Sequence, residues 1–206
     1  MMVSAELRWF WKDEPPRKIS DWFHGGDVRA GGGSALRRDR YFPHEGEPEL
    51  GLKTRDEDGA GAQVEIKGLV ATLPPRGLEL DLRRLEIWCK WSTSVRPTGP
   101  GLLVVKQRWL RKFAADLGEI PLTKDEQDAQ PGPRRGLPAA GCTIELTKVV
   151  LPDPGDTWWT LGFEAFGDLD RVCGVLARTL RTRGPPCADP EAELSYPAWL
   201  KTYYGG

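Results

Sequence analysis

Charged residues recur at every second position in several short segments of this sequence. Pairs two or four residues apart are followed by single acids further along the chain: Glu6/Arg8, Lys53/Arg55, Glu65/Lys67, Glu86/Lys90, Lys106/Arg108, Glu145 and Glu164. In an extended strand, side chains two positions apart point to the same face. The spacing therefore predicts that basic and acidic groups gather on one face of a sheet.

This mixture of charges suits phosphate chemistry. Lys and Arg neutralise phosphate oxygens, while carboxylates hold a divalent cation such as Mg²⁺ that bridges to those oxygens and orients an attacking water. If a sheet of about eight strands closes, its charged face surrounds a lumen that can hold a small ligand. On alternation alone, an open sheet with one solvated face is the simpler interpretation. The residues leave both arrangements open.

The charged segments belong to a mainly β chain with a few helices. Strands are predicted at 3–11, from Arg40 onward, and at 49–55, 63–69, 82–92, 102–112, 142–150 and 157–167. Asp58-Gly59 predicts a hairpin between the 49–55 and 63–69 strands. Helices are predicted at 18–24 and 169–182, and a C-terminal segment at 195–204 carries aromatic residues that cap part of the fold. The segments 29–34 and 123–141 are rich in Gly or Pro and are predicted to be loops that connect these elements.

Composition limits the function further. The 206 residues are expected to form one domain spanning 1–206, and 29 basic residues against 30 acidic ones give a net charge of −1. No overall basic field draws such a protein to duplex nucleic acid or to a membrane surface. We expect a cytoplasmic protein because the N-terminus has no signal-peptide pattern. The four cysteines form no C-x-x-C pair and are expected to be free, mostly buried thiols.

Several short motifs occur in an order that resembles the CYTH-like superfamily, the triphosphate tunnel metalloenzymes. They are Ser-Ala-Glu-Leu-Arg-Trp at 4–9, Asp39-Arg40-Tyr41, Leu-Lys-Thr-Arg at 52–55, Glu-Ile-Lys at 65–67, Val-Lys-Gln-Arg at 105–108, Glu145, Phe163-Glu164 and Ser-Tyr-Pro at 195–197. Together the motifs span almost the whole chain. The resemblance identifies the chain as a divergent member.

The resemblance implies a closed antiparallel β-barrel, a tunnel of about eight strands with a few packing helices. It also implies Mg²⁺- or Mn²⁺-dependent hydrolysis of a triphosphate-containing small molecule. By the same likeness, phosphates would be gripped by Arg8, Lys53, Arg55, Lys67, Lys90, Lys106 and Arg108. Glu6, Glu145 and Glu164 would be the catalytic acids, with Glu6 and Glu164 as metal ligands.

The chain also departs from the family pattern at its acids. Ser4 stands where the family has the first acid of the opening motif, and Glu164 has no acidic partner two residues away. Glu65 and Glu86 either compensate or pair with Lys67 and Lys90. The missing acids favour a second interpretation, a non-catalytic module that binds polyphosphate or a nucleotide.

A third interpretation is a barrel that binds a small amphipathic ligand or a protein partner, which a charged face on the outside would favour. The tryptophans do not decide between the three. Trp9, Trp109 and Trp159 are predicted to lie in the core, and Trp88 either packs in the core or stacks on a ligand ring. The oligomeric state is not predicted.

Overall fold

The computed structural model describes residues 2–25, 36–42, 47–55, 64–74, 85–93, 100–122, 138–153, 155–186 and 189–205. The strands are β1 (Met2–Lys12), β2 (Arg37–Tyr41), β3 (Leu50–Arg55), β4 (Val64–Leu73), β5 (Leu85–Thr93), β6 (Leu102–Ala114), β7 (Glu119–Ile120), β8 (Gly141–Leu151), β9 (Asp156–Phe166) and β10 (Ala192–Glu193). The helices are α1 (Arg17–His24), α3 (Leu169–Arg183) and α4 (Tyr196–Tyr204).

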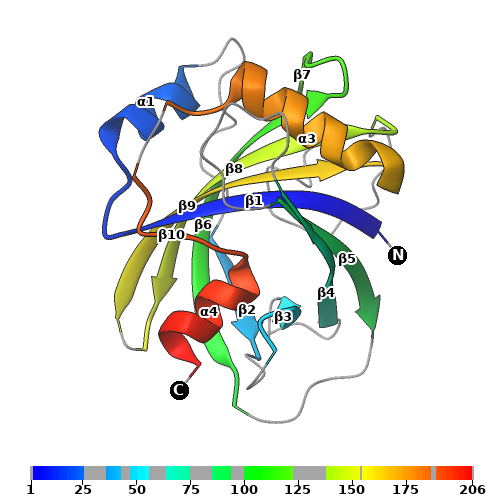
Figure 1. Cartoon of the computed structure of the whole chain (residues 1–206). Coiled ribbons are helices and arrows are strands. Elements are labelled where there is room, and N and C mark those ends of the chain that lie inside the picture. Colours follow the sequence, from blue (N-terminus) through cyan, green and yellow to red (C-terminus); the bar gives the residue numbers. More distant parts are fainter. Residues whose placement is uncertain are drawn as a thin grey trace.

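Eight of these strands form a closed barrel (Figure 1). The order around the wall is β1-β5-β4-β3-β2-β6-β8-β9, and β9 pairs with β1 to close it. Every pairing is antiparallel. The short β7 and β10 extend β6 and β1. The closed antiparallel barrel predicted from the sequence is confirmed.

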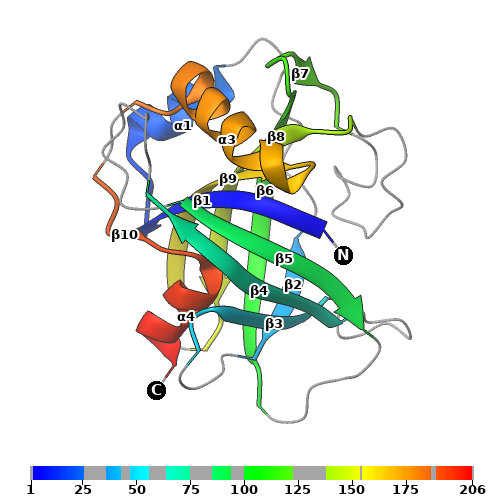
Figure 2. The ribbon, with the colours of Figure 1, turned by 45° about the vertical axis from the view of Figure 1, so that its right-hand side comes forward.

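The outer face of β1, β8 and β9 carries the larger apolar cluster. Alternate residues of these strands, including Leu7, Ile144 and Phe163, are buried there beneath α1 and α3 (Figure 2). The α3 helix buries Val172, Leu176 and related positions at helical spacing, whereas Leu169 in its first turn is 52% exposed. Burial of these groups fixes which face of each strand points outward, because a shift of one residue would expose them.

A second apolar cluster lies inside the barrel at one end. Its inward-facing members are Phe10, Tyr41, Val104, Val149, Leu151 and Trp158. The α4 helix packs on them: Trp199 stacks on Phe10 with ring centroids 4.7 Å apart, and Tyr196 stacks on Tyr41 at 5.2 Å. The Ser195 hydroxyl caps α4 by accepting from the Ala198 amide. The aromatic C-terminal segment therefore closes this end of the lumen.

Most predicted elements are found, with one correction. The second strand does not begin at Arg40; β2 starts at Arg37 and ends at Tyr41. The run before Tyr41 lacks the apolar residues that mark a strand, since its inward positions are charged. The β3 and β4 strands are antiparallel neighbours as predicted. The Asp58-Gly59 turn, the 29–34 connection and most of the 123–141 connection lie outside the described residues.

The described cysteines agree with the sequence. Cys142 is buried, Cys89 and Cys173 are half-buried, and all three are free thiols, while Cys187 lies outside the described residues. Within the part of the chain that the structure describes, none of the helices combines the length and apolar character that a membrane crossing needs.

Candidate ligand-binding site in the barrel lumen

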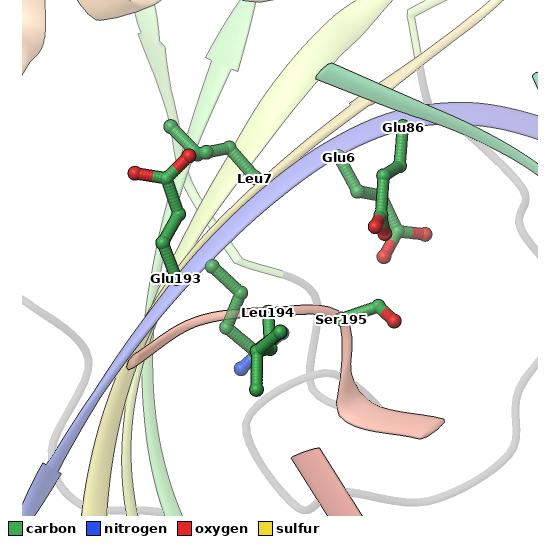
Figure 3. Close-up of a pocket in the computed structure, with 7 residues that line it drawn as sticks. Glu6, Leu7, Glu86, Glu193, Leu194 and Ser195 are labelled. Carbon is green, nitrogen blue, oxygen red and sulfur yellow. The ribbon is translucent and has the colours of Figure 1, made fainter. Parts of the chain in front are cut away.

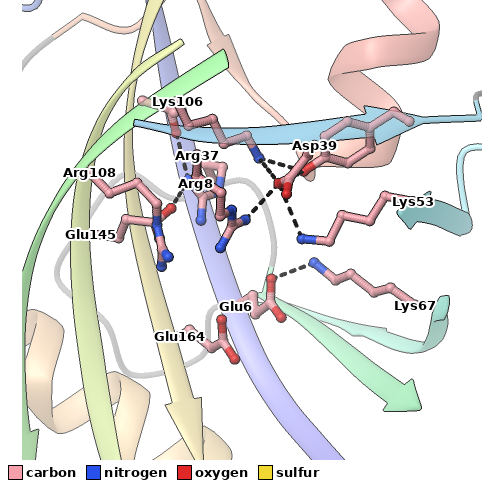
Figure 4. Close-up of polar contacts among 12 residues, drawn as sticks. Glu6, Arg8, Arg37, Asp39, Lys53, Lys67, Lys106, Arg108, Glu145 and Glu164 are labelled. Atoms are coloured by element: carbon pink, nitrogen blue, oxygen red, sulfur yellow. Dashed lines mark hydrogen bonds and ion pairs between the residues drawn. The ribbon is translucent and has the colours of Figure 1, made fainter. Parts of the chain in front are cut away.

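The charged face of the strands points into the barrel. All ten side chains predicted as site residues form ion pairs there, in three separate sets, and none is more than 33% exposed. Figure 4 labels eight of them. The condition that would favour the third interpretation, a charged face on the outside, is therefore not met. The structure brings these residues together, and their functional roles stay predictions.

Asp39 is the centre of the first set of contacts. Its Oδ2 atom lies 2.6 Å from Arg37, 3.2 Å from Lys106 Nζ and 3.5 Å from Lys53 Nζ. The Asp39 side chain is fully buried. A single carboxylate thus faces three cations that arrive from three different strands, β2, β6 and β3 (Figure 4).

Two further carboxylates complete this part of the lumen. Glu145 on β8 pairs with Arg8 at 3.1 Å and accepts from Arg108 Nε at 2.6 Å. Glu65 on β4 pairs with Lys53 at 3.1 Å and Arg55 at 2.5 Å. We call this the cation-rich group; it comprises the bases Arg8, Arg37, Lys53, Arg55, Lys106 and Arg108 and the acids Asp39, Glu65 and Glu145. The six bases outnumber the three acids.

The second set of contacts surrounds Glu6. Its Oε2 atom lies 2.5 Å from Lys67 Nζ, and its Oε1 atom lies 2.8 Å from Lys90 Nζ and accepts from the Ser4 hydroxyl at 2.7 Å. Lys90 also pairs with Glu164 at 2.8 Å. We call Glu6, Lys67, Lys90 and Glu164 the Glu6 group. Its two bases and two acids balance.

Glu86 and Trp88 lie beside this group on β5. Glu86 is opposite Glu6 in the antiparallel register and accepts from the Trp88 indole at 2.9 Å. Trp88 is fully buried, and Lys67 Nζ lies 4.3 Å from its ring centroid. Trp88 is therefore part of the packed interior, where its ring supports Lys67. Trp9 is buried, and Trp109 and Trp159 pack against the outer cluster, as predicted.

Two tyrosines border the cation-rich group at the end closed by α4. Lys106 Nζ donates to the Tyr41 hydroxyl at 2.5 Å and lies 3.9 Å from the Tyr196 ring centroid. The guanidinium of Arg8 lies 5.5 Å from the same ring. Tyr196 thus places an aromatic face and a hydroxyl against the phosphate-binding residues that the sequence predicts.

Burial and charge shift the pKa values in the cation-rich group. Burial alone would raise the pKa of Asp39, but Lys53, Arg37 and Lys106 hold it well below its usual value. Burial lowers the pKa of Lys53 to about 8, although Asp39 and Glu65 oppose it. Burial also lowers the pKa of Lys106 well below its usual value. The two lysines therefore hold their protons less tightly than lysines in water.

Within the described ranges of the chain, five buried polar atoms of this region have no hydrogen-bond partner. They are Arg37 Nε, Asp39 Oδ1, Arg55 Nε, Thr147 Oγ1 and Tyr196 Oη. Thr147 faces Arg108 across the β6–β8 register. A buried polar group without a partner costs free energy, and natural structures retain few of them. Four of the five can donate a hydrogen bond, which an anion with several acceptor oxygens could receive.

A small pocket reaches the lumen through the wall. It lies on β1 where the pairing with β5 ends at Glu6 and the pairing with β10 begins at Trp9. About 300 Å³ of space, part of it open to solvent, is lined by Glu6, Leu7, Arg8, Glu86, Glu193, Leu194 and Ser195 (Figure 3). The pocket touches both groups, because Glu6 belongs to one and Arg8 to the other.

The acids predicted to hold a metal are paired with basic side chains. Among the residues that the structure describes, no three His, Cys, Asp or Glu side chains converge in a way that could hold an ion. Glu6 and Glu164 both form ion pairs with Lys90, and Glu145 pairs with Arg8 and accepts a hydrogen bond from Arg108. The donor set therefore does not fit the Mg²⁺ or Mn²⁺ that the resemblance implies.

Some site residues were not predicted from the sequence. The Asp39-Arg40-Tyr41 motif was given no site role from the sequence, and its Arg40 faces away from the lumen and donates to the Gly101 carbonyl. Arg37 and Asp39 face inward instead. Arg37, Asp39 and Tyr41 are each two residues apart, and this alternation is the pattern that would have predicted that they share the inner face. Tyr196 stands in the Ser-Tyr-Pro motif, but that motif does not place its side chain in the lumen, because the placement depends on how α4 packs.

Comparisons with known proteins add little. No protein-family model and no curated protein matches the chain. One similar solved structure is a crystal structure named "putative adenylate cyclase" from Bacillus halodurans, 9% identical, which covers 97% of this chain and 98% of that one with a TM-score of 0.44. That likeness is too weak to carry an argument. The barrel is established by its own strand pairings, and membership of the CYTH-like superfamily stays a prediction.

Proposed function

We propose that this protein binds a triphosphate-containing small molecule in the barrel lumen. The observation that carries the proposal is the cation-rich group, in which six bases face three acids and buried polar atoms are left without partners. Charge-assisted hydrogen bonds from Arg and Lys to phosphate oxygens are strong, and they strengthen where water is excluded. A chain of phosphates supplies the charge and the acceptors that this group lacks.

The motif order that resembles triphosphate tunnel metalloenzymes supports the same ligand class. It also implies metal-dependent hydrolysis, the more demanding function. We favour binding, because each of the three acids predicted to be catalytic is already engaged by Lys or Arg. Hydrolysis stays a prediction, which an assay of phosphate release with Mg²⁺ or Mn²⁺ would test.

Calorimetry with inorganic tripolyphosphate tests the proposed binding. Replacing both Lys106 and Arg108 by Met should weaken binding about a hundredfold or more, since each charge-assisted hydrogen bond contributes about 1.5–3 kcal/mol. Lys148→Met is the matched control, because Lys148 lies on β8 with its side chain on the outer face. No heat of binding for wild type with tripolyphosphate or ATP, or equal affinity in the double variant, would contradict the proposal.

A further inference from the structure

Lys90 occupies the place where a metal ion would join two carboxylates. Its Nζ atom lies 2.8 Å from Glu6 Oε1 and 2.8 Å from Glu164 Oε1. Glu6 and Glu164 are direct partners in the β1–β9 register, so their side chains leave neighbouring strands side by side. Lys90 reaches them from β5, on the opposite edge of β1. One ammonium group therefore bridges both acids.

The remaining oxygen of Glu6 is occupied as well. Lys67 Nζ lies 2.5 Å from Glu6 Oε2 and rests over the Trp88 ring, and the Ser4 hydroxyl donates to Oε1. Both oxygens of Glu6 thus accept from the protein. Mg²⁺ binds carboxylate oxygens at about 2.0–2.1 Å and holds its own waters tightly. It cannot bridge these acids without displacing the ammonium of Lys90.

The ionisation of these groups agrees with the geometry. Burial would raise the pKa of Glu6, yet Lys67 and Lys90 outweigh it, and the pKa lies below its usual value. Burial would lower the pKa of Lys90, but Glu164 and Glu6 outweigh it and raise the pKa. Lys90 Nζ, at 2.8 Å from one oxygen of each acid, thus neutralises charge on both.

We propose that the ammonium group of Lys90 substitutes for a divalent cation between Glu6 and Glu164, so that the lumen binds polyphosphate without a metal and the carboxylate pair is a latent cation site. The part that concerns polyphosphate rests on the proposed function. The latent cation site does not, because it depends only on the contacts of Lys90.

Mn²⁺ binding by the protein alone tests the latent site. Lys90→Met keeps the bulk of the side chain and removes the ammonium group from Glu164 and from Glu6 Oε1, which still accepts from the Ser4 hydroxyl. We expect Lys90→Met to bind Mn²⁺ at least about tenfold more tightly than wild type, measured by electron paramagnetic resonance of free Mn²⁺. The gain should vanish in Lys90→Met/Glu164→Gln. The control is Lys12→Met, which removes an exposed β1 lysine paired with Asp156 and should not change Mn²⁺ binding.

Equal Mn²⁺ affinity in wild type and a folded Lys90→Met variant would overturn the latent site. Wild-type protein supplies a second test that needs no variant. Its affinity for tripolyphosphate, compared at matched free ligand concentration, should agree within about threefold between chelator and Mg²⁺. Binding that appears only with Mg²⁺ would overturn the inference. If tripolyphosphate binds under neither condition, the proposed function fails, and the Mn²⁺ comparison alone decides the role of Lys90.

Discussion

The two charged groups in the lumen are built from the same residue types on the same alternating strands, yet they differ in balance. In the cation-rich group, Asp39 faces three cations, Arg37 among them. In the Glu6 group, two lysines face two glutamates. The difference shows that alternation places charges in a lumen, whereas cross-strand register decides whether they neutralise one another.

This difference also divides the expected roles. Excess positive charge and unpartnered polar atoms suit the cation-rich group to an added anion. The Glu6 group already satisfies its charges, and we expect it to contribute to the shape and stability of the lumen rather than to ligand affinity. The predictions below compare the two groups.

The largest effect is expected when one acid is removed from each group. Asp39→Ala leaves three buried cations with less compensation and should lower the free energy of unfolding by about 3–5 kcal/mol. Glu164→Ala should lower the free energy of unfolding by about 1 kcal/mol or less, because the Glu164 side chain is a third exposed and Lys90 retains its ion pair with Glu6. Urea denaturation measures both. Asp21→Ala, at an exposed helical pair, is the control, and equal losses at Asp39 and Glu164 would contradict the comparison.

A smaller effect is expected on ligand affinity when one base is removed from each group. Arg37→Met should weaken tripolyphosphate binding about tenfold or more, since Arg37 Nε is a buried donor without a partner. Lys67→Met should weaken binding less than about threefold, because Lys67 is committed to Glu6. Calorimetry of the two variants decides. A larger loss for Lys67 than for Arg37 would reverse the assignment of the anion site.

The pH dependence should report Lys53. Its pKa is about 8 in the folded protein, against 10.5 ordinarily. Above pH 8 the folded protein loses this charge, so tripolyphosphate affinity should fall, while stability rises up to about pH 10.5 because the unfolded chain holds the proton longer. Calorimetry and urea denaturation at about pH 7 and about pH 9.5 measure both. Lys53→Met is the control, because the protonation of tripolyphosphate itself changes with pH in the same way for both proteins. If the variant has the same pH profile as wild type, Lys53 is not the cause.

The smallest effect is expected at the outward-facing neighbour of Asp39. Arg40→Ala should leave tripolyphosphate affinity unchanged within about twofold, because Arg40 contacts the Gly101 carbonyl outside the lumen. A tenfold loss would mean that the β2 register places Arg40, and not Arg37, at the ligand.

Much of the fold could be predicted from the sequence, because the interior and exterior of a barrel strand follow a period of two. The period of two placed Lys106 and Arg108 on one face and Trp9 on the other, and the closed barrel that the resemblance implies made the charged face the inner one. The structure agrees. The partner of each charge could not be predicted. Whether Glu6 meets a cation depends on the register of β1 with β5, which no local pattern encodes.

Two kinds of site residue were beyond a local pattern. Arg37 and Asp39 lie on a strand with few apolar residues, so its beginning was placed too late. Tyr196 reaches the lumen from a helix, and its contact with Lys106 depends on α4 packing on Phe10 and Tyr41. The candidate site thus combines predictable strand faces with unpredictable tertiary contacts.

A crystal structure of the wild-type protein with tripolyphosphate, grown in the presence of a chelator, tests the central claim most directly. We predict phosphate oxygens within hydrogen-bond distance of Arg37 Nε, Thr147 Oγ1 and Tyr196 Oη, with Lys90 still bridging Glu6 and Glu164. Tripolyphosphate bound on the outer face of the barrel, or bound in the lumen without contact to the cation-rich group, would contradict it.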